Sequence, residues 1–200
     1  MKLAIPTESV KDELRVAATP ETVKKLTALG FKVTVQAGAG EGSRIADPEY
    51  AAAGATIADS ADAAVKDADV VLRVRRPSPE EAGKFKKGAI VIGAMDPIGA
   101  ESDIEALAKT GVHAFSMEFM PRITRAQVMD VLSSQANLAG YQAVIDAAEQ
   151  FDRAMPMMMT AAGTISPAKV FVMGAGGAGL QAIATARRLG AAVPATDVRP

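Results

Sequence analysis

Residues 169–197 of the 200-residue sequence read KVFVMGAGGAGLQAIATARRLGAAVPATD, and they decide the fold class. The pattern G-x-G-x-x-G, formed by Gly174, Gly176 and Gly179, follows an apolar run that is typical of a strand buried on both faces. A helical pattern and a second short strand come next, and Asp197 closes that strand. Strand, glycine loop, helix, strand and acid in this order predict a βαβ unit that binds a dinucleotide.

The chemistry expected of this unit follows from its backbone. Glycines let the backbone approach a pyrophosphate, while the N-terminus of the following helix supplies N–H donors and a positive dipole end. The Asp197 carboxylate would accept hydrogen bonds from the adenosine ribose and repel a 2′-phosphate, which favours NAD over NADP. The competing interpretation is a glycine-rich packing turn beside a solvated aspartate, and the order of the elements disfavours it.

A second glycine cluster, Gly38, Gly40 and Gly42, also follows an expected strand. Residues 43–48 do not begin a clear amphipathic helix, and no acid follows at the distance that the dinucleotide pattern requires. We therefore expect a packing turn here.

Upstream of the dinucleotide motif, short β-rich runs alternate with helical patterns, which is typical of βαβ units and a parallel sheet. The expected strands are residues 2–5, 31–36, 68–74, 89–94 and 112–118, and the expected helices run from Thr19 to Gly30 and over 61–68 and 101–111. From Thr124 the pattern becomes one long helix. The predicted fold class is α/β, with a doubly wound, mostly parallel N-terminal domain at 1–123, a linking helix at 124–154, and the first βαβ part of a Rossmann domain at 155–200.

The end of the sequence is unusual for this fold. The chain stops at Pro200 after one βαβ unit, whereas a complete Rossmann sheet has six strands. Pro194 also lies within the expected strand that carries Asp197, and proline belongs on the edge of a sheet. We therefore expect a fragment of a longer protein.

Composition excludes several classes of protein. A formal net charge of −1 argues against a nucleic-acid binder, which normally has a basic surplus. The absence of cysteine removes disulfides and thiolate metal sites. The N-terminus becomes charged too early for a signal peptide, and the most apolar region is too interrupted by proline, lysine and glycine to span a bilayer.

Polar residues gather just before the apolar part of the long helix, in the stretch PRITRAQVMDVLSSQ at residues 121–135. Arg122, Gln127 and Asp130 would need partners at the end of a mostly buried face, and a ligand is one of the possibilities. A structural role explains them equally well. Thr124 and Gln127 match a capping box, and Arg122 with Asp130 would make an ion pair.

Three stretches, at residues 4–26, 120–148 and 157–191, closely resemble the NAD(H)-binding alpha subunit, or domain I, of proton-translocating NAD(P) transhydrogenases. The PRITRAQVMD stretch is specific to that group, whereas the related alanine dehydrogenases share the N-terminal and glycine-loop patterns. The resemblance implies two α/β lobes with NAD(H) in the cleft between them. It also implies hydride exchange with NADP(H) held on a partner subunit, coupled to proton movement through a membrane subunit.

The resemblance also implies a homodimer that lies in the cytoplasm, associated with the inner membrane through its partner subunits and not inserted in it. The matching residues fall in three groups: the nicotinamide side at Arg122, Gln127, Asp130, Leu132 and Ser133; the pyrophosphate loop at Gly174, Gly176, Gly177, Ala178 and Gly179; and the ribose and adenine contacts at Asp197, Val198 and Arg199. Arg122, Gln127 and Asp130 are the candidates for catalysis, and no metal site is expected.

An alanine dehydrogenase must move protons as well as hydride, so it needs an acid–base group that titrates near neutrality. Where that family has a histidine after the strand at 89–94, this sequence has Asp96. Arg75 stands where that family uses a lysine, and an arginine cannot exchange protons at neutral pH. Arg15 is common to both families, and His113 is expected to be a packing or surface residue.

Transfer between two nicotinamides needs no proton at either carbon, but it needs the rings held in contact in a fixed field. Arg122, Gln127 and Asp130 suit that task because they position without titrating. Two alternatives stay open: an alanine-dehydrogenase-like NAD oxidoreductase, and a non-catalytic NAD-binding or assembly remnant, which the early end of the chain and Pro194 favour.

Overall fold

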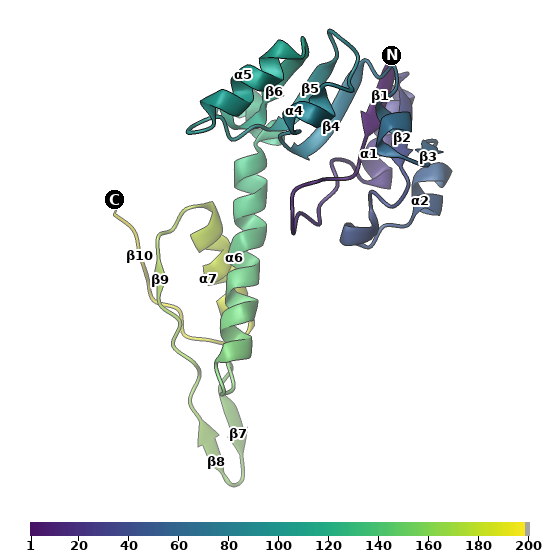
Figure 1. The fold of residues 1–200 in the computed structure, drawn as a ribbon. Coiled ribbons are helices and arrows are strands. Elements are labelled where there is room, and N and C mark those ends of the chain that lie inside the picture. The colour runs from purple at the N-terminus through teal and green to yellow at the C-terminus, as the bar shows by residue number, and fades with distance from the viewer. Residues whose placement is uncertain (199–200) are drawn as a thin grey trace. The chain divides into compact units, whose positions relative to one another are not determined.

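The structure, a computed structural model, describes residues 1–198. It divides into two compact units, Met1–Pro121 and Arg122–Pro200 (Figure 1). Arg199, predicted to contact adenine, lies outside the described residues.

The first unit is built on a six-stranded sheet whose strands all pair in parallel, in the order β3-β2-β1-β4-β5-β6. The strands are β1 (Lys2–Ile5), β2 (Lys32–Gln36), β3 (Thr56–Ala58), β4 (Val70–Arg75), β5 (Ile90–Ala94) and β6 (His113–Ser116). The order extends in both directions from the β1–β4 pair, which defines a doubly wound sheet. The five strands expected from the sequence are confirmed, and β3 is an additional strand.

Helices connect these strands: α1 (Pro20–Ala28), α2 (Asp47–Ala52), α3 (Ala61–Val65), α4 (Pro79–Ala82) and α5 (Glu101–Lys109), with 3₁₀ turns η1 (Glu41–Ser43) and η2 (Met117–Phe119). Helix α1 begins as expected, with the Thr19 side chain accepting from the Thr22 N–H and proline in the first turn. No helix was expected where α2 lies, so that expectation was wrong. This short helix is held by the Glu49 carboxylate, which accepts from the Ala46 N–H at 3.0 Å, and by the buried Tyr50.

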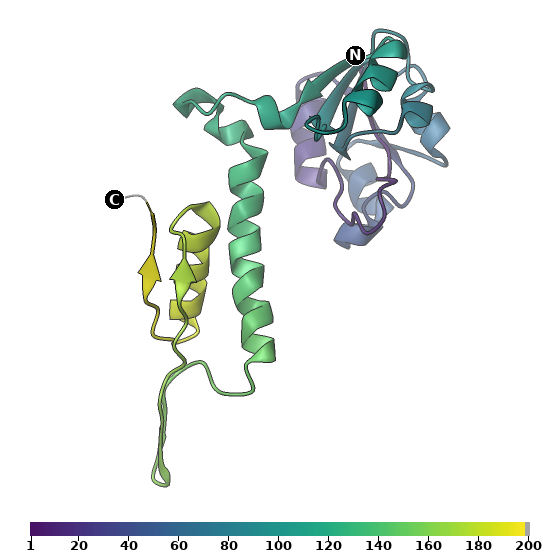
Figure 2. The same ribbon diagram turned by 60° about the vertical axis from the view of Figure 1, so that its left-hand side comes forward.

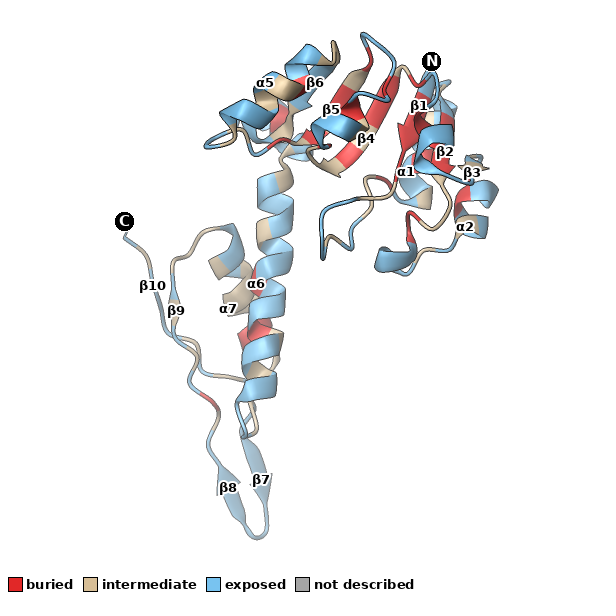
Figure 3. Cartoon of the chain, in the orientation of Figure 1, coloured by how far each residue is buried: buried red, intermediate tan, exposed pale blue. Residues whose placement is uncertain are grey.

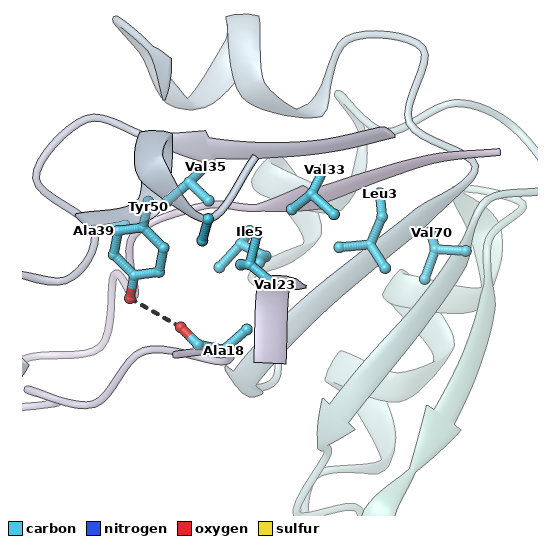
Figure 4. Packing of buried hydrophobic residues seen from close by; sticks show 10 residues of the cluster. Leu3, Ile5, Ala18, Val23, Val33, Val35, Ala39, Tyr50 and Val70 are labelled. Atoms are coloured by element: carbon cyan, nitrogen blue, oxygen red, sulfur yellow. Dashed lines mark hydrogen bonds between the residues drawn. The ribbon is translucent and has the colours of Figure 1, made fainter. Parts of the chain in front are cut away.

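The core of this unit covers both faces of the sheet, as alternation along each strand requires. On β1, Leu3 and Ile5 belong to one buried cluster, while Ala4 between them belongs to another. Val70 and Val71 on β4 divide in the same way. Figure 4 shows the first cluster, in which the Tyr50 hydroxyl donates to the Ala18 carbonyl at 2.9 Å.

Tyr50→Phe tests this hydrogen bond. The substitution leaves the buried Ala18 carbonyl without the Tyr50 donor, so we expect the free energy of unfolding to fall by about 1–2 kcal/mol. Denaturant-induced unfolding followed by circular dichroism measures the change. Tyr141→Phe is the matched control, since that side chain is 48% exposed, and its effect should stay within about 0.5 kcal/mol. Equal losses in both variants would contradict the assignment.

The second glycine cluster is a packing turn, as expected. The Gly38 N–H donates to the Asp47 carboxylate, and Gly38 has a φ of +76°. A Cβ on Gly42 would lie 2.7 Å from the Leu14 carbonyl oxygen, so this turn presses against the segment that follows β1. The glycines are therefore occupied by contacts within the unit.

The second unit contains η3 (Thr124–Met129), α6 (Val131–Gln150), β7 (Met158–Thr160), β8 (Gly163–Ile165), β9 (Val172–Met173), α7 (Gly177–Arg188) and β10 (Ala195–Thr196). The helix expected from Thr124 is wrong at its start, because 3₁₀ structure occupies 124–129 and α6 begins only at Val131. The methionine-rich segment expected to be a loop contains the antiparallel hairpin β7–β8. None of the helices in residues 1–198 is long and apolar enough to cross a bilayer.

Strands β9 and β10 pair in parallel around α7, which gives the predicted βαβ unit (Figure 2). Pro194 precedes β10, and only its carbonyl is used, accepting from the Val172 N–H at 3.0 Å. The expectation of a strand buried on both faces is wrong here, since Phe171 is 59% and Met173 81% exposed. Within the described residues β9 has only β10 as a neighbour, so its other edge and its faces stay uncovered.

Helix α6 packs against α7 along one face. The buried residues are Gly140 and Val144 on α6 and Thr185 and Ala186 on α7, while the rest of α6 is largely exposed (Figure 3). The two helices run in the same direction, because the start of α7 lies beside the middle of α6 and the turn after α7 lies beside Pro156.

Candidate dinucleotide-binding site

The glycine loop between β9 and α7 has the geometry that a pyrophosphate site requires. Gly174 has a φ of +101°, a conformation that side chains rarely adopt. A Cβ on Gly179 would lie 1.8 Å from the Gly174 carbonyl oxygen, so no side chain fits there. Gly176 is the N-cap of α7, and no side chain caps this helix end. The N–H groups of the first turn, including those of Gly177 and Ala178, are thus available to an anion.

Asp197 lies directly beside this loop. One carboxylate oxygen accepts from the Ala175 N–H at 2.6 Å, which ties the end of β10 to the turn after β9. The sequence did not anticipate this contact. An open pocket of about 510 Å³ lies here, lined by Met173, Gly174, Gly176, Thr196, Asp197 and Val198. An apolar lining with one carboxylate matches the chemistry of an adenosine, whose base is flat and whose ribose donates hydrogen bonds.

Asp130 has a role that the sequence did not reveal, because it is the N-cap of α6. Its carboxylate accepts from the N–H groups of Leu132 and Ser133 at 3.0 and 3.1 Å, and from the Ser133 hydroxyl at 2.6 Å. The structure therefore brings Asp130, Leu132 and Ser133 together at one helix terminus. The Asp130 carboxylate is fixed by its own helix before any ligand binds.

The Ser133 hydroxyl is the largest of the influences that hold the pKa of the Asp130 carboxyl below its ordinary value of 3.8, and the backbone N–H groups and the Arg122 charge act in the same direction. Because the folded-state pKa is lowered, the capping interaction is fully present above pH 3.8 and is lost as the pH falls through the lower folded-state value. We expect Ser133→Ala to move the NMR titration midpoint of Asp130 upward, toward 3.8.

Ser134→Ala is the matched control for this titration, since the Ser134 hydroxyl donates to the Val131 carbonyl instead. It should leave the Asp130 midpoint in place. An unchanged midpoint in Ser133→Ala, or equal shifts in both variants, would contradict the assigned hydrogen bond.

Arg122 and Gln127 are exposed and are not engaged by the structural roles that the sequence left open. Among the described residues, Arg122 forms no ion pair with Asp130, although its charge lowers the pKa of that carboxyl. The capping box is also wrong: the N-cap of η3 is Ile123, and no side chain caps it. Gln127 contributes only its backbone carbonyl, which accepts from the Asp130 N–H at 3.2 Å. Both side chains are free to meet a ligand.

In the first unit, Asp96 follows β5 in a turn with a φ of +43°. Its N–H donates to Glu118 at 2.6 Å, and its carbonyl accepts from Arg76 at 2.9 Å. Burial raises the pKa of Glu118, but hydrogen bonds from Ser116 and from the backbone around Asp96 outweigh it and leave that pKa below 4.5. This turn is held by an ionised carboxylate and an arginine, and neither titrates near neutrality.

The two units thus combine a doubly wound sheet, a long helix and a dinucleotide-type glycine loop, which defines a Rossmann-type nucleotide-binding protein. Residues 4–139 match the alanine dehydrogenase/PNT N-terminal domain, and residues 143–200 match the alanine dehydrogenase/PNT C-terminal domain. The chain belongs to the alanine dehydrogenase/PNT family.

Individual relatives agree with the resemblance drawn from the sequence. The chain is 56% identical to the first of the polypeptides that make up NAD(P) transhydrogenase subunit alpha in Rhodospirillum rubrum, covering all of this chain and 53% of that protein. It is 34% identical to alanine dehydrogenase of Mycobacterium tuberculosis, over 99% of this chain and 54% of that one. The chain therefore spans about half the length of these relatives.

Solved structures show the same relationship. The crystal structure of transhydrogenase from Sinorhizobium meliloti matches with a TM-score of 0.96 and 64% identity, over the whole of this chain and 60% of that one. An L-alanine dehydrogenase structure matches with a TM-score of 0.86 and 27% identity, over the whole of this chain and 55% of that one. The predicted fold class and the predicted kinship are confirmed.

Proposed function

We propose that this chain is the NAD(H)-binding part of an NAD(P) transhydrogenase alpha subunit. In this role it exchanges hydride with NADP(H) on a partner subunit, and a membrane subunit couples the exchange to proton translocation. The observation that carries the proposal is the Asp130 N-cap with Arg122 and Gln127 beside it in sequence and unpaired, in the same unit as the glycine loop.

The nucleotide would lie across the second unit. The pyrophosphate binds the N–H groups at the start of α7, and the adenosine fills the pocket at Asp197 and Val198. The nicotinamide then extends toward the N-terminus of α6, where Asp130, Leu132 and Ser133 meet. Asp197 would exchange its hydrogen bond with the Ala175 N–H for the ribose hydroxyls, and its charge would disfavour a 2′-phosphate.

The bound nicotinamide supplies the hydride chemistry, and the residues of this chain position it. Arg122 and Gln127 offer donors to the carboxamide and ribose, and Asp130 presents a carboxylate whose lowered pKa keeps it ionised at neutral pH. These three groups hold one protonation state across the neutral range, so they provide orientation and a fixed field. Hydride transfer between two nicotinamides asks for nothing more.

The related function, alanine dehydrogenation, is disfavoured by the turn after β5. It holds Asp96 where a proton-exchanging histidine would be needed, and Arg75 at the end of β4 cannot exchange protons. His113 lies exposed on the edge strand β6.

Two assays test the proposal. The chain, mixed with the NADP(H)-binding subunit of a transhydrogenase, should transfer hydride from NADPH to an NAD analogue of distinct absorbance. It should not consume NADH in the presence of pyruvate and ammonia. Appreciable pyruvate reduction would overturn the transhydrogenase assignment in favour of the dehydrogenase. A folded chain that binds NADH without transferring hydride would instead indicate a binding or assembly remnant.

A further inference from the structure

Helix α6 contains a glycine at a place where helices normally avoid one. Gly140 lies in the middle of the 20-residue helix α6, and glycine destabilises a helix interior relative to alanine. Its backbone does not require glycine, since it is helical and has no positive φ. The reason must lie in packing.

The packing partner of Gly140 is the first turn of α7. A Cβ on Gly140 would lie 2.1 Å from the Ala178 carbonyl oxygen and 2.8 Å from its carbonyl carbon. These atoms are backbone, so the contact cannot be relieved by a rotamer change and α7 itself would have to move. One turn earlier, the Ala136 methyl is 3.8 Å from the position that a Cβ on Gly177 would take. Gly140 therefore sets how closely the start of α7 approaches α6.

We propose that Gly140 is a positioning residue for the dinucleotide, and this inference rests on the proposed function. The start of α7 carries the pyrophosphate N–H groups, and the same helix α6 carries Ser133 and Asp130 at its N-terminus, about 10–15 Å further along its axis. The Gly140–Ala178 contact fixes the offset between these two places. A single dinucleotide can reach both only when the offset is kept.

Ligands of different length should respond differently to a change in this offset. ADP would contact only the α7 N-terminus and the Asp197 pocket, which belong to the βαβ unit and move together. NADH would contact this unit and the α6 N-terminus at once. A methyl group on Gly140 should therefore weaken NADH binding while leaving ADP binding nearly intact.

The test measures NADH and ADP affinities of the chain by calorimetry. In Gly140→Ala we expect NADH affinity to fall about tenfold or more and ADP affinity to change less than about threefold. Ala139→Ser, which adds one heavy atom at the neighbouring exposed position, should keep both affinities. Unchanged NADH affinity in Gly140→Ala, or an equal loss for both ligands, would overturn the positioning role.

A second variant covers the case in which Gly140→Ala does not fold. Ala136→Val widens the same contact from the partly buried position one turn earlier and is judged by the same selective loss of NADH affinity. Failure of this inference is distinct from failure of the proposed function. If the parent chain does not bind NADH, the proposed function falls and the inference with it. If the parent binds and the variants bind equally well, only the positioning role falls.

Discussion

Gly179→Ala should weaken NADH binding by at least about a hundredfold. A Cβ at this position would lie 1.8 Å from the Gly174 carbonyl oxygen and 2.8 Å from its carbonyl carbon. Both are backbone atoms of the turn that presents N–H groups to the pyrophosphate, so relief of the contact must distort that turn. Equilibrium binding measured by NADH fluorescence gives the change in affinity.

Two further glycine variants calibrate this result. Gly83→Ala, at the end of α4, has a φ of −62° and no contact closer than 3.4 Å, so it should bind NADH like the parent. Gly177→Ala lies within the loop, but its nearest neighbour would be 3.8 Å away, so a milder loss is expected than for Gly179→Ala. NADH affinity within about threefold of the parent in Gly179→Ala would contradict the assignment of this loop to the pyrophosphate.

Arg122→Ala should slow hydride transfer to the partner-bound nucleotide about a hundredfold, while NADH affinity changes less than about threefold. Arg122 is exposed and makes no ion pair within the described residues, so its removal leaves the fold intact. Its charge matters only when two nicotinamides are brought together, which is a property of the transition state. Single-turnover stopped-flow absorbance gives the transfer rate, and fluorescence titration gives the affinity.

The neighbouring Arg125 supplies the control for this prediction. It is an exposed arginine in the same 3₁₀ segment, with the same charge and length. Arg125→Ala should keep both the transfer rate and the affinity. Equal losses of rate and affinity in Arg122→Ala would show that Arg122 binds the ground state, which contradicts a positioning role.

The elements that the sequence predicted well are those with strong local patterns. The strands of the first unit combine β-branched runs with flanking turn residues, and α1 has a capping threonine, a proline and a terminal glycine in sequence. The glycine loop was predictable because the steric demand at Gly179 comes from Gly174, in the same short loop. In each case the deciding interactions are close in sequence.

The features that were missed depend on contacts distant in sequence or on competition between local signals. Helix α2 is short and is anchored by Tyr50, whose partner Ala18 lies in another segment. At the start of α6, the Thr124 pattern and Asp130 both promise a cap, and Asp130 prevails with three hydrogen bonds. The importance of Gly140 depends on Ala178, which approaches it only after α6 and α7 pack.

The central claim is direct, proton-free hydride transfer, and an isotope label tests it. NADH carrying deuterium at the transferring C4 position is bound to the chain, and the NADP(H)-binding subunit is supplied with NADP⁺. We predict that the deuterium appears at C4 of the NADPH formed, with none released to water and a rate that is flat across neutral pH. Release of the label to water, or a rate that titrates with a single base, would contradict direct transfer.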